Sequence, residues 1–146
     1  MEYEFRPWLV RWLYGYAFLH FLVGIGMTWM MESTFFESYH QLVLGRFWPE
    51  GSSVIARELH LWWLKLFGAT LQFAAIFMAV LIYMGDRTRR AAVWLWMMIG
   101  LVVWGPQDIY VSLQRDLWIH LWIDLFVLSS MLPPLFLLWR VDSKAV

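Results

Sequence analysis

Long apolar segments separated by short polar stretches dominate this chain. Four segments are long enough for a helix to cross the hydrocarbon core of a bilayer, which takes about 20 apolar residues: 8–31, 59–84, 91–113 and 117–139. Between the first two lies a more polar stretch, residues 32–57. We therefore expect one all-α domain over residues 1–146, a polytopic integral membrane four-helix bundle with an outer loop at 32–57.

Composition and charge fit this interpretation. Hydrophobic residues make up 62% of the chain and charged residues 15%, which is more apolar than an ordinary soluble core requires. The chain has as many Lys and Arg residues as Asp and Glu residues, but basic and acidic residues gather in different connections between the apolar segments. By the positive-inside rule, both termini and the 85–90 turn are cytoplasmic and the more acidic 32–57 loop is outside, in an inner or plasma membrane. The lipid bilayer is the expected partner, and no nucleic acid is expected. The basic residues on the inner side are Arg6, Arg11, Arg87, Arg89, Arg90, Arg140 and Lys144.

Two stretches of the chain nearly repeat each other. Residues 57–67 read RELHLWWLKLF, and residues 115–126 read RDLWIHLWIDLF. Each opens a long apolar segment, so His60 and His120 are expected at similar depth near the outer face. The match predicts a pseudo-two-fold repeat of helical hairpins.

The paired histidines predict a cofactor site. Cysteine is absent, which excludes thiolate ligands and c-type haem attachment, so a cofactor would be held noncovalently. Bis-histidine ligation of haem iron needs two imidazoles from facing helices at one depth, and His60 and His120 meet that requirement. Gly24, Gly26 and Gly105 would leave room for the ring. The arrangement resembles one haem layer of the respiratory cytochrome b four-helix bundles, which implies a b haem or an adjacent quinone. The alternative is that both histidines are interfacial side chains bonded to loop carbonyls or water.

Other ionisable residues in the outer half suggest further hypotheses. Asp124, one turn beyond His120, could orient that imidazole or neutralise Lys65 in an ion pair. Glu32 and Asp108, together with the two histidines, could bind a divalent metal ion through nitrogen and oxygen ligands.

A second resemblance involves segment 12–20 (WLYGYAFLH), the long outer loop, segment 63–67 (WLKLF) and the proline-containing last helix that ends at Arg140. These features are similar to the EXPERA family, which includes emopamil-binding sterol isomerases and sigma-2-receptor-like proteins. The resemblance implies a lipid-accessible pocket for a sterol- or isoprenoid-like ligand. In an enzyme of that kind, His20, Glu32 and Asp108 would handle protons or orient the lipid.

The sequence therefore leaves three functions open, all built on an outward-facing polar pocket. The most specific is a small redox-associated subunit of electron transport that binds b haem or quinone through His60 and His120. The second is an EXPERA-like isomerase or binder of a hydrophobic small molecule. The third is a structural or assembly subunit that docks partner subunits of a membrane complex or forms a homo-oligomer.

Overall fold

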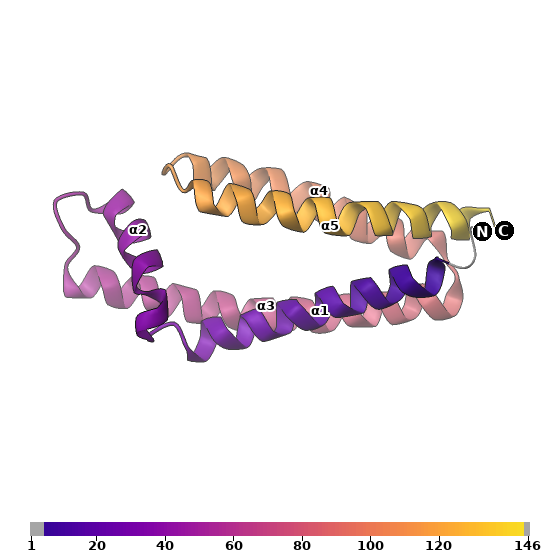
Figure 1. Ribbon diagram of the computed structural model, residues 1–146, viewed down its shortest axis with the longest axis horizontal. Coiled ribbons are helices and arrows are strands. Elements are labelled where there is room, and N and C mark those ends of the chain that lie inside the picture. Colours follow the sequence, from indigo (N-terminus) through magenta and orange to yellow (C-terminus); the bar gives the residue numbers. More distant parts are fainter. Residues whose placement is uncertain (1–4, 145–146) are drawn as a thin grey trace.

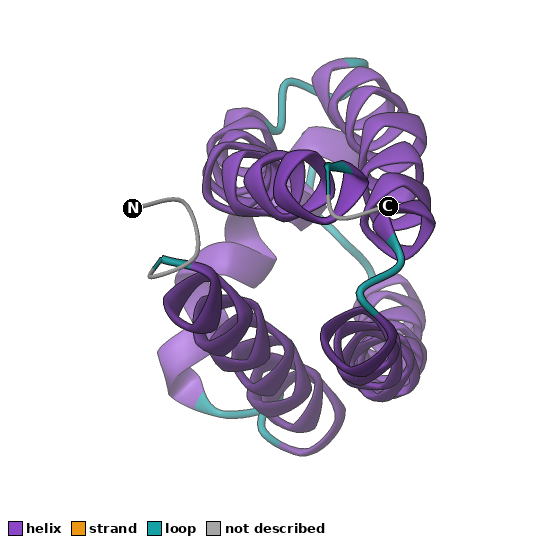
Figure 2. Cartoon of the chain, turned by 90° about the vertical axis from the view of Figure 1, so that its right-hand side faces the viewer, coloured by secondary structure: helices purple, strands orange, loops and turns teal. Residues whose placement is uncertain are grey.

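The computed structural model describes residues 5–144, and within them every regular element is helical, with no strand (Figure 2). The elements are α1 (Arg6–Trp29), the 3-10 helix η1 (Thr34–Phe36), α2 (Glu37–Phe47), α3 (Val54–Thr88), α4 (Ala91–Leu113) and α5 (Trp118–Ser143). Four of these helices, α1, α3, α4 and α5, are long and apolar enough to cross a membrane. The prediction of an all-helical chain with four apolar spans is confirmed.

The predicted outer loop is the region where the helix boundaries differ most. It contains η1 and α2, and α3 begins at Val54 rather than near residue 59. Ser53 causes the early start, because its side-chain oxygen accepts a hydrogen bond from the Ala56 N–H at 3.1 Å and so caps the helix. With 35 residues, α3 is about 52 Å long. It is therefore longer than the hydrocarbon core, and its first turns lie beside α2.

The long helices form two pairs, α1 with α3 and α4 with α5. The start of α1, the end of α5 and the turn between α3 and α4 lie at one end of the molecule, here called the terminal end (Figure 1). The pairs approach each other there and diverge toward the opposite end, the α2 end, where α2 crosses the space between them. Among the described residues, α3 and α5 do not pack against each other.

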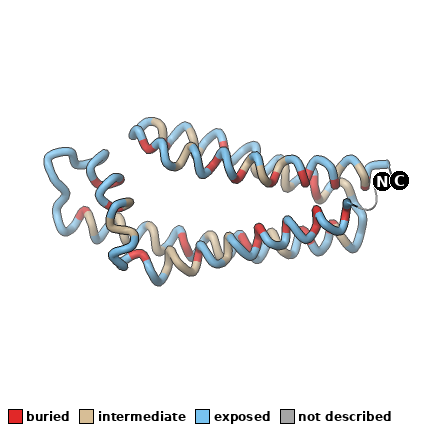
Figure 3. Tube along the Cα trace, in the orientation of Figure 1, coloured by how far each residue is buried: buried red, intermediate tan, exposed pale blue. Residues whose placement is uncertain are grey.

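Glycine permits the closest approach within each pair. A Cβ at Gly24 of α1 would lie 2.7 Å from the backbone oxygen of Gly68 on α3, and one at Gly105 of α4 would lie 2.8 Å from the side chain of Leu128 on α5. The larger buried side chains gather toward the terminal end (Figure 3). The core is formed by Leu9, Val10, Leu13, Tyr16, Ala17, Ile82, Trp94, Val127, Met131, Leu135 and Leu138.

A buried ionic cluster joins all four long helices at the terminal end. Arg6 of α1 donates from Nε and Nη2 to the two carboxylate oxygens of Asp142 on α5, both at 3.1 Å, and from Nη1 to Asp86 on α3. The indole N–H of Trp94 on α4 donates to Asp142 at 2.8 Å. Arg6 is 3% exposed and Asp142 is 1% exposed. Since each charge here has partners on other helices, the cluster fixes how the two pairs meet.

Candidate functional site

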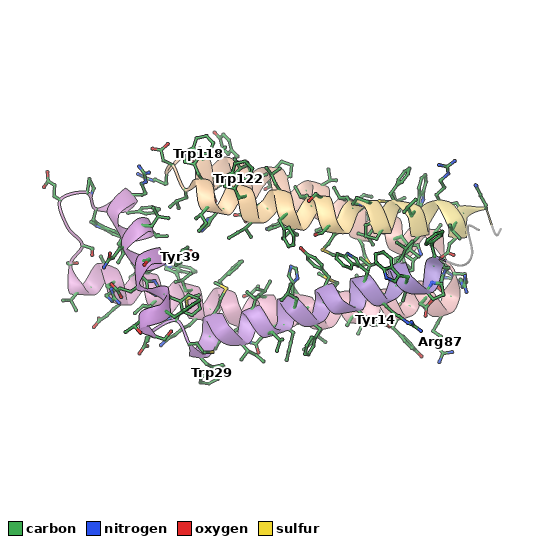
Figure 4. The ribbon with its side chains drawn as sticks, in the orientation of Figure 1. Tyr14, Trp29, Tyr39, Arg87, Trp118 and Trp122 are labelled. Carbon is green, nitrogen blue, oxygen red and sulfur yellow. The ribbon has the colours of Figure 1, made fainter. Side chains whose placement is uncertain are left out.

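A group of hydrogen-bonded polar side chains occupies the α2 end, and we call it the histidine cluster. It consists of Tyr39, His40, His60, Ser112 and His120, which come from α2, α3, α4 and α5. Figure 4 shows Tyr39 on α2, between the two helix pairs. The ring of Tyr39 lies 6.2 Å from that of His60 and 6.1 Å from that of His120, measured between centroids. The prediction that these two histidines lie at similar depth agrees with this placement.

His40 links α2 to α3. Its Nε2 lies 2.7 Å from the carbonyl oxygen of Met31, and since a carbonyl can only accept, this nitrogen donates. Its Nδ1 lies 3.0 Å from Nε2 of His60. When His40 is neutral, its Nδ1 is an acceptor and His60 donates to it. His40 is completely buried, so this paired arrangement satisfies both of its nitrogens away from water.

Tyr39 links α2 to the other helix pair. Its hydroxyl lies 3.2 Å from Nε2 of His120, and Nδ1 of His120 lies 3.0 Å from the hydroxyl of Ser112. Burial, and secondarily the charge of Asp108, raise the pKa of Tyr39 above its ordinary value. The phenol therefore remains protonated and can donate to His120, whose other nitrogen then donates to Ser112.

Two carboxyl groups lie one helical turn from the hydrogen-bonded Ser112 and His120. Asp108 precedes Ser112 by four residues on α4, and Asp124 follows His120 by four residues on α5, so each pair shares a helix face. The hydrogen bond between Ser112 and His120 sets the register of α4 against α5, and this register brings Asp108 and Asp124 opposite each other. Asp124 is 3% exposed, and its Oδ2 has no hydrogen-bond partner. Neither residue takes part in the ion pairs formed by the described residues.

Two hollows follow one face of α4. The first is an open recess of about 420 Å³ lined by Trp104, Gln107, Asp108 and Val111. The second is a pocket of about 250 Å³ between α3, α4 and α5, lined by Ala74, Met78, Leu81, Trp96, Met97, Gly100, Leu101 and Met131. Residues 97, 101, 104, 108 and 111 recur at intervals of three and four, so they form one stripe of the helix, the α4 stripe. The recess, which has two polar side chains in its lining, and the apolar pocket are therefore consecutive along this stripe.

The predicted ion pair between Lys65 and Asp124 is wrong. Lys65 is paired with Glu32 instead, at the start of the connection between α1 and η1. That hydrogen bond and the charge of Lys65 lower the pKa of Glu32. Asp124 takes part in none of the ion pairs among the described residues, and Lys65 does not reach it because α3 and α5 lie diagonally and do not meet.

The other predicted acid–base residues do not assemble into one site. His20 lies on α1 and donates from Nδ1 to the carbonyl of Tyr16, one turn earlier, at 3.0 Å. Glu32 is exposed and belongs to the ion pair with Lys65. Of the three, only Asp108 adjoins the histidine cluster. Among the described residues, no group of three or more His, Cys, Asp or Glu side chains could hold a metal ion, so the predicted divalent-metal set of Glu32, Asp108 and the two histidines is not formed.

The space expected for a haem is already filled. Gly24 and Gly105 face neighbouring helices, and only Gly26 has open space around it. Tyr39 packs against both His60 and His120, and both ring nitrogens of His120 are hydrogen-bonded within the protein. In this arrangement the residues do not fit a haem between the two imidazoles. Haem ligation by His60 and His120 stays a prediction, and it would require displacement of Tyr39.

Sequence reasoning missed Tyr39, His40 and Ser112, although these residues complete the cluster. Tyr39 and His40 lie in the stretch that the sequence analysis assigned to a loop. A loop assignment predicts neither how deep these side chains lie nor which residues they contact. The one available signal was that this stretch had room for a short helix with adjacent aromatic and imidazole rings. Comparisons with protein-family models, curated proteins and solved structures give no match for this chain.

Proposed function

We propose that this protein binds an apolar small molecule within the membrane, along the α4 stripe between the two helix pairs. The observation that carries the proposal is the succession of two hollows on that stripe, a recess with two polar side chains in its lining and a wholly apolar pocket. Ligand sites typically combine a mostly apolar lining with a few converging polar groups. Here Gln107 and Asp108 supply the polar groups of the recess.

The lining of the apolar pocket supports a flexible or irregular ligand. Three of its eight residues are methionines, Met78, Met97 and Met131, one from each of the three helices that surround it. Methionine side chains adapt to irregular shapes because they are unbranched and polarisable. The recess on the stripe is open, and it lies on the part of α4 nearer the α2 end, toward which the helix pairs diverge (Figure 1). The proposal is a binding function of the kind implied by the EXPERA resemblance.

Gly100 offers a direct test because it lines the pocket and a Cβ there would meet nothing within 4 Å. Gly100→Leu therefore places a side chain at the pocket wall without a backbone clash. Gly15→Leu is the matched control, since Gly15 also faces open space but lies on α1, outside the pocket. Both variants would be compared with wild type in bilayer nanodiscs by photolabelling with an alkyl diazirine, followed by peptide mapping.

We expect the probe to label α4 near residues 96–101 and α5 near Met131 in wild type and in Gly15→Leu. Labelling of these sites should fall at least about tenfold in Gly100→Leu, equivalent to about 1.4 kcal/mol of lost binding. Ala74→Leu, which changes the α3 wall of the same pocket, provides a second variant if Gly100→Leu does not fold. Equal labelling of blocked and control variants would overturn the proposal.

A further inference from the structure

A group of arginine and tyrosine side chains lies on the outer surface of the α1–α3 pair near the terminal end, and we call it the outward cluster. Arg11 and Tyr14 come from α1, and Tyr83 and Arg87 come from α3. All four are exposed. Figure 4 shows Tyr14 and Arg87 on the side of the α1–α3 pair that faces away from α4 and α5.

The opposite directions of α1 and α3 make these side chains converge. Arg6, at the start of α1, lies 3.4 Å from the carbonyl oxygen of Gly85, near the end of α3, so the two helices are antiparallel. Side chains on a helix lean toward its own N-terminus. The two residues from α1 therefore lean toward the terminal end, and the two from α3 lean away from it. Arg87 follows this rule, since its guanidinium carbon lies 5.7 Å from the centre of the Tyr83 ring.

The outward cluster carries positive charge that the described part of the chain does not neutralise. Neither Arg11 nor Arg87 takes part in the ion pairs among the described residues. The carboxylate next to Arg87 in the chain, that of Asp86, is already bonded to Arg6. Since α3 ends at Thr88, Arg87 lies where the helix leaves the apolar part of the bilayer. Tyrosine is enriched at this depth, beside the lipid head groups.

We propose that the outward cluster binds the phosphate head group of an anionic phospholipid in the leaflet at the terminal end. The planar guanidinium of Arg87 can donate two parallel hydrogen bonds to phosphate oxygens, the geometry in which arginine binds phosphate most strongly. The hydroxyls of Tyr14 and Tyr83 supply further donors beside it. Arg11 lies three residues before Tyr14 on the same face of α1, and its long side chain can extend toward the head group.

The surface below the cluster fits the acyl chains of the same lipid. Phe73, Ile76, Val80 and Tyr83 recur at intervals of three and four on α3, so they form one stripe of that helix, and each is about half exposed or more. This stripe lies on the opposite face of α3 from Ala74, Met78 and Leu81, which line the apolar pocket. The lipid site is therefore separate from the α4 stripe and does not depend on the proposed function.

Charge complementarity favours an anionic lipid over a zwitterionic one. Phosphatidylcholine also has a phosphate, but its quaternary ammonium would lie beside Arg11 and Arg87. Two more exposed arginines, Arg89 and Arg90, follow in the turn before α4 and strengthen that repulsion. Phosphatidylglycerol has the same phosphate without the cation, and its hydroxyls can accept hydrogen bonds. The cluster should therefore select phosphatidylglycerol from phosphatidylcholine.

The test is native mass spectrometry of the full-length protein released from micelles of an uncharged detergent. The probes are dioleoylphosphatidylglycerol and dioleoylphosphatidylcholine, which have the same acyl chains. We expect the first phosphatidylglycerol to bind with a dissociation constant at least about tenfold lower than that of phosphatidylcholine, equivalent to about 1.4 kcal/mol. Arg87→Gln should weaken phosphatidylglycerol binding at least about fivefold, equivalent to about 1 kcal/mol, because the charged fork is lost.

Arg140→Gln is the matched control, since Arg140 is also exposed near the terminal end but lies on α5, in the other helix pair. Tyr83→Phe, which removes one hydroxyl and keeps the ring, should also weaken phosphatidylglycerol binding and serves if Arg87→Gln does not fold. Equal binding of the two lipids, or equal losses in Arg87→Gln and Arg140→Gln, would overturn the proposal. Excess sn-glycerol 3-phosphate should leave the lipid bound. Its displacement of the lipid would show a site for soluble phosphate compounds instead.

Discussion

Removal of the Arg6 side chain should destabilise the protein more than any other single change at the terminal end. Arg6→Met leaves Asp142 buried, at 1% exposure, with only the Trp94 N–H at 2.8 Å and Arg89 at 3.9 Å. Breaking a buried ion pair by deleting one partner typically costs about 3–5 kcal/mol, because the other charge remains uncompensated. Arg89 can move toward Asp142, so we expect a loss near the lower end, about 3 kcal/mol.

The measurement is reversible unfolding in mixed detergent micelles, with thermal unfolding as a second readout. Arg11→Met is the control, since Arg11 is exposed on the same helix and should change stability by no more than about 0.5 kcal/mol. The double variant Arg6→Met/Asp142→Leu should recover much of the loss because no charge is left buried. Similar losses in Arg6→Met and Arg11→Met, or a double variant that loses the sum of both single effects, would refute the reasoning.

Three further predictions concern packing, pH and topology. Gly24→Ala should destabilise the protein by more than about 1 kcal/mol in the same unfolding assay, because its Cβ would lie 2.7 Å from the backbone oxygen of Gly68. Gly26→Ala should stabilise it by up to about 1 kcal/mol, because Gly26 has open space around it and alanine favours the helix. The bond to Arg57 lowers the pKa of Glu37 to about 2, so its stabilising effect is complete above pH 4.5 and is lost as pH falls toward 2. Hydrogen exchange in α2 should accelerate over that interval in wild type and much less in Glu37→Gln. Reporters inserted at 89–90 and fused after α5 should both read cytoplasmic, and an external reading at 89–90 would invert the expected orientation.

The sequence predicted the spans because their signal is local. An apolar run of sufficient length favours a membrane helix whatever surrounds it, and each predicted segment overlaps one long helix. The ends of the helices were harder to predict than the spans. The start of α3, for example, is set by one side chain, that of Ser53, which caps the helix. Pro133 and Pro134 show the same limit. Proline inside a helix removes a backbone hydrogen bond and usually kinks or ends it, yet α5 continues through both residues to Ser143.

The candidate site was predictable only in part, because its contacts are long-range. Depth along two helices predicted that His60 and His120 lie near one level, and their rings lie 6.2 and 6.1 Å from the ring of Tyr39. Which side chain lies between them depends on the path of α2, and periodicity carries no information about that path. The predicted ion pair between Lys65 and Asp124 failed because sequence also does not show which helices are neighbours. The two residues were predicted at similar depth, but α3 and α5 lie diagonally, and Lys65 pairs with Glu32.

The two ends of the molecule hold the helix pairs together by different chemistry. At the terminal end the contacts are buried and ionic, and the single side chain of Arg6 bonds to residues on two other helices, α3 and α5. At the α2 end, α2 is joined to the α4–α5 pair by a hydrogen bond between Tyr39 and His120, an exposed ion pair between Arg46 and Asp116 at 4.0 Å, and the Arg115 guanidinium 4.9 Å from the centre of the Phe47 ring. An exposed pair contributes at most about 1 kcal/mol, and a typical hydrogen bond contributes about as much. Separation of the pairs at the α2 end is therefore far less costly than at the terminal end. Because the open recess of the α4 stripe lies toward that same weak end, a ligand that enters the stripe there does not disturb the ionic cluster that maintains the fold.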